Sequence, residues 1–170
     1  MVPTTSHDEP PRPLDAIDRQ ILEVLQDDAR ISNVDLAGRV GLSPSPCLRR
    51  VRELEERGVV RRYDALLDPA AVGLGDSVFV QVRLERQAEQ GLDTFETRIL
   101  ARPEVLECYL MTGDADYLLR VVVPDVSAFE RFLLDHLTRI PGVSSVKSSF
   151  ALKQVTYRTS LPLSRKGNTE

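Results

Sequence analysis

The 170-residue sequence contains no tryptophan, only two cysteines and only two histidines. Cys47 and Cys108 lie far apart in different patterns, so they predict small apolar packing roles rather than a disulfide framework or a zinc cage. His7 lies in the N-terminal tail and His136 in a helical pattern, which leaves no Ser/His/Asp or Cys/His arrangement. The sequence also lacks a glycine-rich phosphate loop and a dinucleotide fingerprint. These absences argue against an enzyme and predict no metal site and no cofactor.

Long hydrophobic runs are missing as well. None approaches the roughly 18 residues needed to span a bilayer, and the first residues are polar and proline-rich. We therefore expect a cytoplasmic protein with no membrane partner. Residues 1–13 contain four prolines without an apolar period, which is typical of a disordered tail, and a second tail is expected at 161–170.

The charge of the chain is unevenly distributed. The net charge is −4, which argues against general coating by nucleic acid. Residues 15–28 contain five acidic side chains and one arginine, whereas residues 43–63 contain six arginines and three glutamates. A local concentration of positive charge is what a phosphate footprint requires.

Three helical patterns occupy the first third of the chain. Apolar side chains recur at helical spacing over 14–30. The second pattern opens with Ser32, followed three residues later by Asp35, and closes on Gly41, which are helix start and stop signals. The third runs from the Ser-Pro pairs to Gly58. The side chains expected to face inward are Ile17, Ile21, Leu25, Leu36, Ala37, Val40, Leu48, Val51 and Leu54.

The third helix begins with two serine–proline pairs. Proline suits a first helical turn because the N–H that it lacks would have no intrahelical acceptor there. Ser43 as N-cap places Pro44 at N1 and Pro46 at N3. Ser45 as N-cap places Pro46 at N1 and avoids a helical residue before a proline. The sequence leaves both alternatives open.

A short strand is expected at Val59–Tyr63, directly after the third helix. Three helices followed by such an arm predict a winged helix-turn-helix domain over 14–63. A linker is expected at 64–76.

From residue 77 the spacing of the apolar residues changes. This change indicates a second domain, expected over 77–160. Strand-like runs at 77–85, 104–113, 116–124 and 143–157 alternate with helical patterns at 92–101 and 126–140. The helical stripe of the second pattern consists of Val126, Phe129, Leu133, Leu137 and Ile140. The order βαββαβ predicts an α+β, ferredoxin-like sheet with both helices on one face. We expect a second copy to bury the other face.

The third helix is the first candidate site. Serine hydroxyls and the positive end of the helix dipole suit phosphate, and the forks of Arg49, Arg50 and Arg52 suit guanine edges or phosphates. The alternative is a solvated face whose i, i+4 pairs with glutamate contribute about 0.2–0.5 kcal/mol each. The preceding helix, the tight "VGLS" turn and the basic Arg61 and Arg62 favour the DNA-binding interpretation.

The second candidate is the turn in "MTGDADYLLRV". Asp114 and Asp116 could hold an ammonium group or a cation. The alternative is an ordinary turn in which both carboxylates hydrogen-bond the local backbone, and spacing alone favours it.

These motifs together resemble the Lrp/AsnC family of bacterial transcription regulators over residues 14–163. The resemblance is carried by "LDAIDRQILEVLQDDARISNVDLAGRVGLSPSPCLRRVRELEERGVV", "LLDPAAVGLG", "PEVLECYLMTGDADYLLRV" and "IPGVSSVKSSF". The second half is most similar to the subgroup that activates branched-chain keto acid dehydrogenase operons.

The resemblance implies a nucleoid-associated protein with a DNA-binding domain and an amino-acid-sensing domain that dimerises and assembles into octamers. DNA would be contacted, at an imperfect palindrome, by Ser43, Ser45, Pro46, Arg49, Arg50 and Arg52. The effector, with branched-chain amino acids favoured, would lie between dimers against Met111, Thr112, Gly113, Asp114, Asp116 and Tyr117, with Ser148, Ser149, Phe150 and Ala151 from a facing strand. Asp114 stands where many members have glutamate. The competing interpretation is an amino-acid-binding interaction module that does not act on DNA.

Overall fold

The computed structural model describes residues 13–85 and 89–163. The two expected tails therefore fall largely on residues 1–12 and 164–170, outside the described residues. The chain divides into two compact units. One contains the described residues up to Ala65 together with the segment that begins at Thr156, and the other spans Leu66–Val155.

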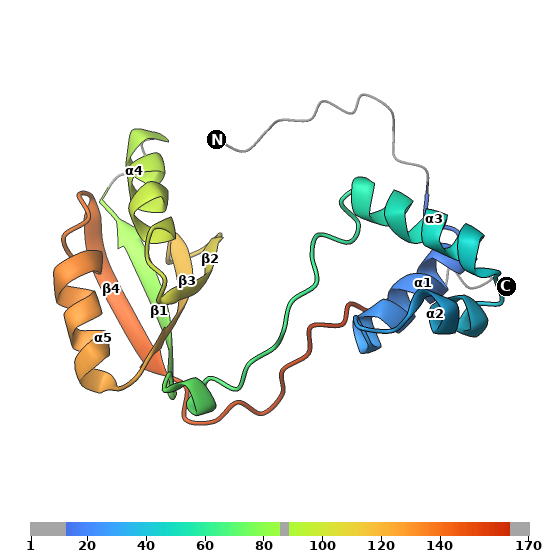
Figure 1. The fold of residues 1–170 in the computed structure, drawn as a ribbon. Coiled ribbons are helices and arrows are strands. Elements are labelled where there is room, and N and C mark those ends of the chain that lie inside the picture. The colour runs from blue at the N-terminus through green and yellow to red at the C-terminus, as the bar shows by residue number, and fades with distance from the viewer. Residues whose placement is uncertain (1–12, 86–88, 164–170) are drawn as a thin grey trace, which may run out of the picture. The chain divides into compact units, whose positions relative to one another are not determined.

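The described part of the N-terminal unit contains three helices (Figure 1), α1 (Ala16–Asp27), α2 (Asn33–Arg39) and α3 (Pro44–Glu56). Asp15 caps α1 and exchanges capping-box hydrogen bonds with Asp18. Ser32 caps α2 as the sequence predicts. The turn after α2 needs a left-handed backbone, which glycine supplies at Gly41 with φ 70°. The core is built from Ile21, Leu22, Leu36, Ala37, Val40, Cys47 and Leu54.

The buried stripe of α3 differs from the predicted one by a rotation of the helix. Cys47 and Leu54 are fully buried and Val51 packs against them, whereas Leu48 is 38% exposed. The prediction was therefore right for Val51 and Leu54 and wrong for Leu48. Positions 47, 51 and 54, four and three residues apart, fit one helical face as well as 48, 51 and 54, three residues apart, and one residue corresponds to 100° of rotation. The small Cys47 takes the inward position.

Two segments that the sequence predicts as strand are irregular. Residues 59–63 pair with no strand of the described chain, because the N–H groups of Val59 and Val60 both donate to the carbonyl of Leu54 and close the end of α3. The last strand ends at Phe150, and residues 151–163 run on without regular structure. Both segments are drawn as loop in Figure 1, where the colour bar locates them by residue number.

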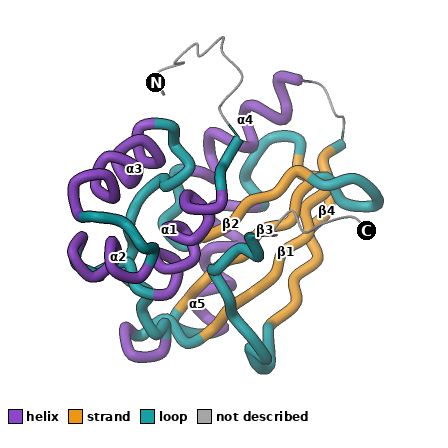
Figure 2. The backbone as a smooth tube through the Cα atoms, turned by 90° about the vertical axis from the view of Figure 1, so that its right-hand side faces the viewer, coloured by secondary structure: helices purple, strands orange, loops and turns teal. Residues whose placement is uncertain are grey.

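The second unit confirms the predicted βαββαβ order. It consists of the strands β1 (Asp76–Leu84), β2 (Val105–Leu110), β3 (Tyr117–Val123) and β4 (Val143–Phe150), and of the helices α4 (Glu89–Leu100) and α5 (Val126–Phe132). A 3₁₀ turn, η1 (Ala70–Val72), precedes β1, and a π-helical turn, η2 (Leu133–Leu137), continues α5. The strands, orange in Figure 2, lie in the order β2-β3-β1-β4, and every neighbouring pair is antiparallel. The fold is α+β, with both helices on one face of the sheet.

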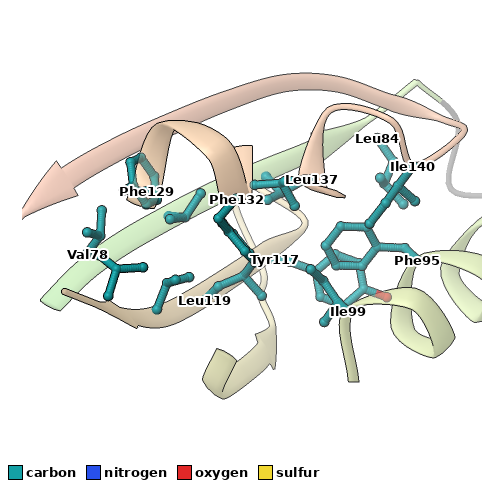
Figure 3. Close-up of a cluster of buried hydrophobic side chains, with 14 residues drawn as sticks. Val78, Leu84, Phe95, Ile99, Tyr117, Leu119, Phe129, Phe132, Leu137 and Ile140 are labelled. Atoms are coloured by element: carbon teal, nitrogen blue, oxygen red, sulfur yellow. The ribbon is translucent and has the colours of Figure 1, made fainter. Parts of the chain in front are cut away.

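The core of this unit lies between the sheet and its two helices (Figure 3). Alternate residues of β1, namely Val78, Val80, Val82 and Leu84, point into it as predicted. Phe129, Leu137 and Ile140 are buried and Leu133 packs against them, but Val126 is exposed because it lies in the first turn of α5, directly after the N-cap Asp125. Phe132, outside the predicted stripe, is buried instead.

In the described part of the second unit, no helix covers the opposite face of the sheet. Phe79 and Tyr109 are exposed there. Between them Arg120 donates to Glu107 at 2.8 Å, and this hydrogen bond lowers the pKa of the Glu107 carboxyl. A face that combines exposed aromatic side chains with a half-buried ion pair is suited to contact with another protein surface.

Candidate functional sites

The sequence left Ser43 and Ser45 as alternative N-caps at the entrance of α3, and the structure has Ser43 in this position. Ser43 is the N-cap with an extended backbone, Pro44 occupies N1, and the Ser43 side chain makes no capping hydrogen bond. A contact from α2 accounts for the earlier start, since the Asn33 amide donates to the carbonyl of Pro44 at 2.8 Å. Because Pro44 and Pro46 have no N–H, this entrance presents the hydroxyls of Ser43 and Ser45 rather than a row of amide groups.

Arg49 and Arg52 share the exposed face of α3. The Arg49 side chain is 70% exposed and forms an ion pair with Glu53 at 3.0 Å. An exposed i, i+4 pair is weak and screened by salt, so it leaves the guanidinium available to a phosphate or a base. The structure therefore places two arginines on the exposed face of the helix that begins at the serine-lined entrance.

Arg50 lies on the other side of the helix, away from the flank where the sequence predicts it. One nitrogen, Nη1, donates to Asp15 and to Asp18, each at 2.7 Å. The Arg50 side chain is 24% exposed and that of Asp18 only 1%. The hydrogen bonds to Asp15 and then Asp18 raise the pKa of the Arg50 guanidinium. Arg50 thus joins α3 to the start of α1 and does not share the exposed face.

Arg61 and Arg62 are exposed in the irregular segment after α3. Arg62 forms an exposed ion pair with Asp64 at 2.6 Å. Tyr63, between them and Asp64, donates to Glu55 of α3, and burial together with this bond raises the pKa of Tyr63 to about 12. The tyrosine contact ties this basic segment to α3.

The turn between β2 and β3 exposes the first four residues of the predicted effector site, Met111, Thr112, Gly113 and Asp114. Gly113 has φ 117°, a backbone conformation that residues with a side chain rarely adopt. The Arg83 side chain donates to the carbonyl of Asp114 at 2.8 Å and holds the turn against β1.

Asp116 and Tyr117 belong to the interior of the sheet unit. Asp116 is 8% exposed, and its Oδ2 accepts the backbone N–H of Leu84 at 2.7 Å. The Tyr117 ring packs against Phe95 with centroids 4.5 Å apart (Figure 3), and its hydroxyl donates to Glu96. Burial, followed by this hydrogen bond, raises the pKa of Tyr117. Both side chains build the frame that carries the exposed turn.

An Asp116→Ala substitution is expected to destabilise the sheet unit by about 1–3 kcal/mol, because it leaves the buried N–H of Leu84 without its acceptor. Urea unfolding of the full-length protein measures this cost. Asp114→Ala, at an exposed neighbouring position, is the matched control and is expected to stay within about 0.5 kcal/mol of the parent. Equal stability of both variants would contradict the structural role of Asp116.

The second predicted set runs alongside β1, from its middle toward the end of the sheet opposite that turn; it consists of Ser148, Ser149, Phe150 and Ala151. Ser148 pairs with Val80 and Phe150 with Val78, whereas Tyr117 pairs with Val82. At about 3.3 Å per residue, Ser148 lies about 7 Å and Phe150 about 13 Å from Tyr117 along β1, and β4 and β3 flank β1 on opposite sides. One chain does not bring the two halves of the predicted effector site together.

Comparison with known proteins agrees with both units. Residues 14–61 match the winged helix-turn-helix DNA-binding family, and residues 77–161 match the Lrp/AsnC ligand binding domain. The chain belongs to the Lrp/AsnC family. It is therefore a DNA-binding transcriptional regulator with a ligand-binding domain, as the sequence predicts. No helix in the part of the chain that the structure describes is long and apolar enough to cross a membrane.

Individual relatives cover nearly the whole chain. The Bkd operon transcriptional regulator of Pseudomonas aeruginosa is 53% identical over 150 residues, which are 88% of this chain and 98% of that protein. The leucine-responsive regulatory protein of Escherichia coli K12 is 45% identical over 88% of this chain and 92% of its own length. A Neisseria meningitidis transcriptional regulator crystallised with L-Met has a TM-score of 0.85 and 47% identity, covering 89% of this chain and 97% of that chain.

Proposed function

We propose that Ser43, Ser45, Arg49 and Arg52 carry the DNA contacts of this regulator, with Pro46 shaping the helix entrance and Arg61 and Arg62 adding phosphate contacts. The observation that carries the proposal is the division of α3 into two faces. Cys47, Val51 and Leu54 pack into the N-terminal unit, and the serines and two arginines remain exposed. A helix of 13 residues is about 20 Å long, enough for its first half to enter a major groove about 12 Å wide.

The protein acts as a dimer, and dimers assemble further, with an octamer as the expected end state. The sheet face that bears Phe79, Tyr109 and the Arg120–Glu107 pair supports dimerisation, since its aromatic side chains are exposed in the described part of the second unit. Two copies would present their α3 helices to half-sites about 34 Å apart, so the target is an imperfect palindrome.

The effector is an amino acid with an aliphatic side chain, with branched-chain amino acids first. Support comes from relatives whose names refer to leucine and to the Bkd operon, and from a neighbour crystallised with L-Met. The exposed turn 111–114 of one copy and residues 148–151 of another would form the pocket between dimers. The distance between these two sets within one chain agrees with a pocket that two copies complete.

Binding to DNA is tested with a duplex selected from a random pool by the full-length protein. We expect specific binding whose affinity falls by at least about 10³-fold between 50 and 200 mM salt, because several phosphates are neutralised at once. The readout is fluorescence anisotropy of the labelled duplex. Absence of any selected sequence would favour an amino-acid-binding module that does not act on DNA.

The effector assignment is tested by calorimetric titration of the full-length protein with the standard amino acids. Leucine, isoleucine and valine are expected to bind and to change the affinity for the selected duplex by about 5–150-fold. Binding confined to polar or charged amino acids would overturn the branched-chain assignment while leaving the DNA-binding function intact.

A further inference from the structure

The exposed face of α3 carries one large apolar side chain, that of Leu48. It lies one turn after Ser45 and one turn before Arg52, and it directly precedes Arg49 in the chain. Leu48 is the fifth residue of the helix, within the half that points toward the entrance. Its 38% exposure contrasts with the complete burial of Cys47.

The outward position of Leu48 follows from the contact that orients the helix. Arg50 is held by Asp15 and Asp18 against α1. Residues two positions apart in an α-helix differ by about 200° of rotation about its axis. Leu48 therefore points to nearly the opposite side of the helix from Arg50. The same ion pair that removes Arg50 from the DNA-facing surface therefore keeps Leu48 on it.

Leucine offers a different chemistry from its neighbours on this face. Arginine and serine recognise phosphates and hydrogen-bonding base edges, whereas a leucine side chain offers only apolar contact. The major groove presents one apolar feature on natural base pairs, the C5 methyl group of thymine. Residues in the N-terminal half of a recognition helix are the ones that contact base edges.

We infer that Leu48 is a specificity-determining residue that packs against a thymine methyl group in each half-site. The inference rests on the proposed DNA-binding role of α3 and adds which base feature this position recognises. Burial of one methyl group predicts a preference of about fourfold per half-site and about 15-fold for a symmetric pair of half-sites.

Deoxyuridine provides the test because it lacks only the methyl group of thymine. In the duplex selected by the full-length protein, each symmetric pair of thymines is replaced in turn by deoxyuridine, and affinity is measured by anisotropy. At one pair the parent protein is expected to lose about 4- to 15-fold. Leu48→Ala is expected to bind the thymine duplex more weakly by a similar factor and to bind both duplexes equally.

Val34 of α2 supplies the matched control, since it is also an exposed apolar residue of the N-terminal unit, with 66% exposure. Val34→Ala is expected to retain the difference between thymine and uracil. Thermal unfolding, monitored by circular dichroism, checks that both variants fold like the parent, as exposed positions should.

The outcomes separate the inference from the function on which it rests. Failure of the parent protein to bind any selected duplex would overturn the proposed DNA contacts, and the role of Leu48 with them. Specific binding without a uracil-sensitive position, or a sensitivity that persists in Leu48→Ala, would overturn the Leu48 assignment alone. Loss of the difference between thymine and uracil in Val34→Ala would assign the methyl contact to α2 instead of Leu48.

Discussion

An Arg50→Ala variant is expected to lose about 3 kcal/mol of folding free energy in its N-terminal unit. The substitution removes the guanidinium from Asp18, whose carboxylate is almost completely buried, and from Asp15. Removing one partner of a buried ion pair is costly, whereas an exposed pair such as Arg49–Glu53 contributes little. Domain stabilities are commonly 5–15 kcal/mol, so this loss is a large share of the stability of a small helical unit.

Native-state hydrogen exchange of the full-length protein measures the effect separately in the two units. Amides of α1 and α3 are expected to lose protection in Arg50→Ala, and those of the β1 and β3 ladder are expected to keep it. Arg49→Ala is the control, one residue away on the exposed face. An Arg50→Ala variant that keeps full amide protection but binds DNA as weakly as Arg49→Ala would show instead that Arg50 contacts DNA.

The double variant Arg49→Ala/Arg52→Ala is expected to keep its fold and lose at least about 10²-fold in affinity for the selected duplex. A good arginine contact to a base contributes about 1–3 kcal/mol, and a dimer would lose such contacts in both half-sites. Removal of phosphate contacts should also make the affinity less sensitive to salt. Anisotropy titrations at several salt concentrations measure both quantities.

An arginine of the other unit provides the control for this experiment. Arg139 is exposed and pairs with Asp135 at i, i+4, as Arg49 does with Glu53. Arg139→Ala is therefore matched in charge and setting, and it is expected to leave DNA affinity unchanged. Equal affinities of parent and double variant, with the same salt dependence, would exclude α3 as the DNA-contacting helix.

The contrast between Arg49 and Arg50 shows where inference from the sequence succeeded and failed. The existence of α3, its end near Gly58 and its role in the core were predictable, because proline placement and helical spacing are local signals. The rotation of α3 was not predictable, since Cys47 and Leu48 both fit the spacing. The deciding contact joins Arg50 to Asp15, 35 positions away in the chain. The cluster of acidic residues in 15–28 was the one available signal for that contact.

In the second unit, too, local patterns were predictable from the sequence and contacts between distant elements were not. The alternation of valines in β1 and the order of strands and helices were sufficient to predict the antiparallel sheet. The predicted effector residues, in contrast, separated into an exposed turn at 111–114 and the interior pair Asp116 and Tyr117. Their sequence neighbourhood gave no indication of this, because burial of Tyr117 depends on Phe95 of α4.

By itself, the sequence determined two units, the family to which they belong and most element boundaries, because hydrophobic period, caps and turns act over a few neighbouring residues. Only the tertiary structure decided which side of α3 is free, that Ser43 rather than Ser45 begins it, and that residues 148–151 lie far from the 111–114 turn. Each of these depends on contacts between elements distant in the chain: Arg50 with α1, Asn33 with Pro44, and the strand register along β1.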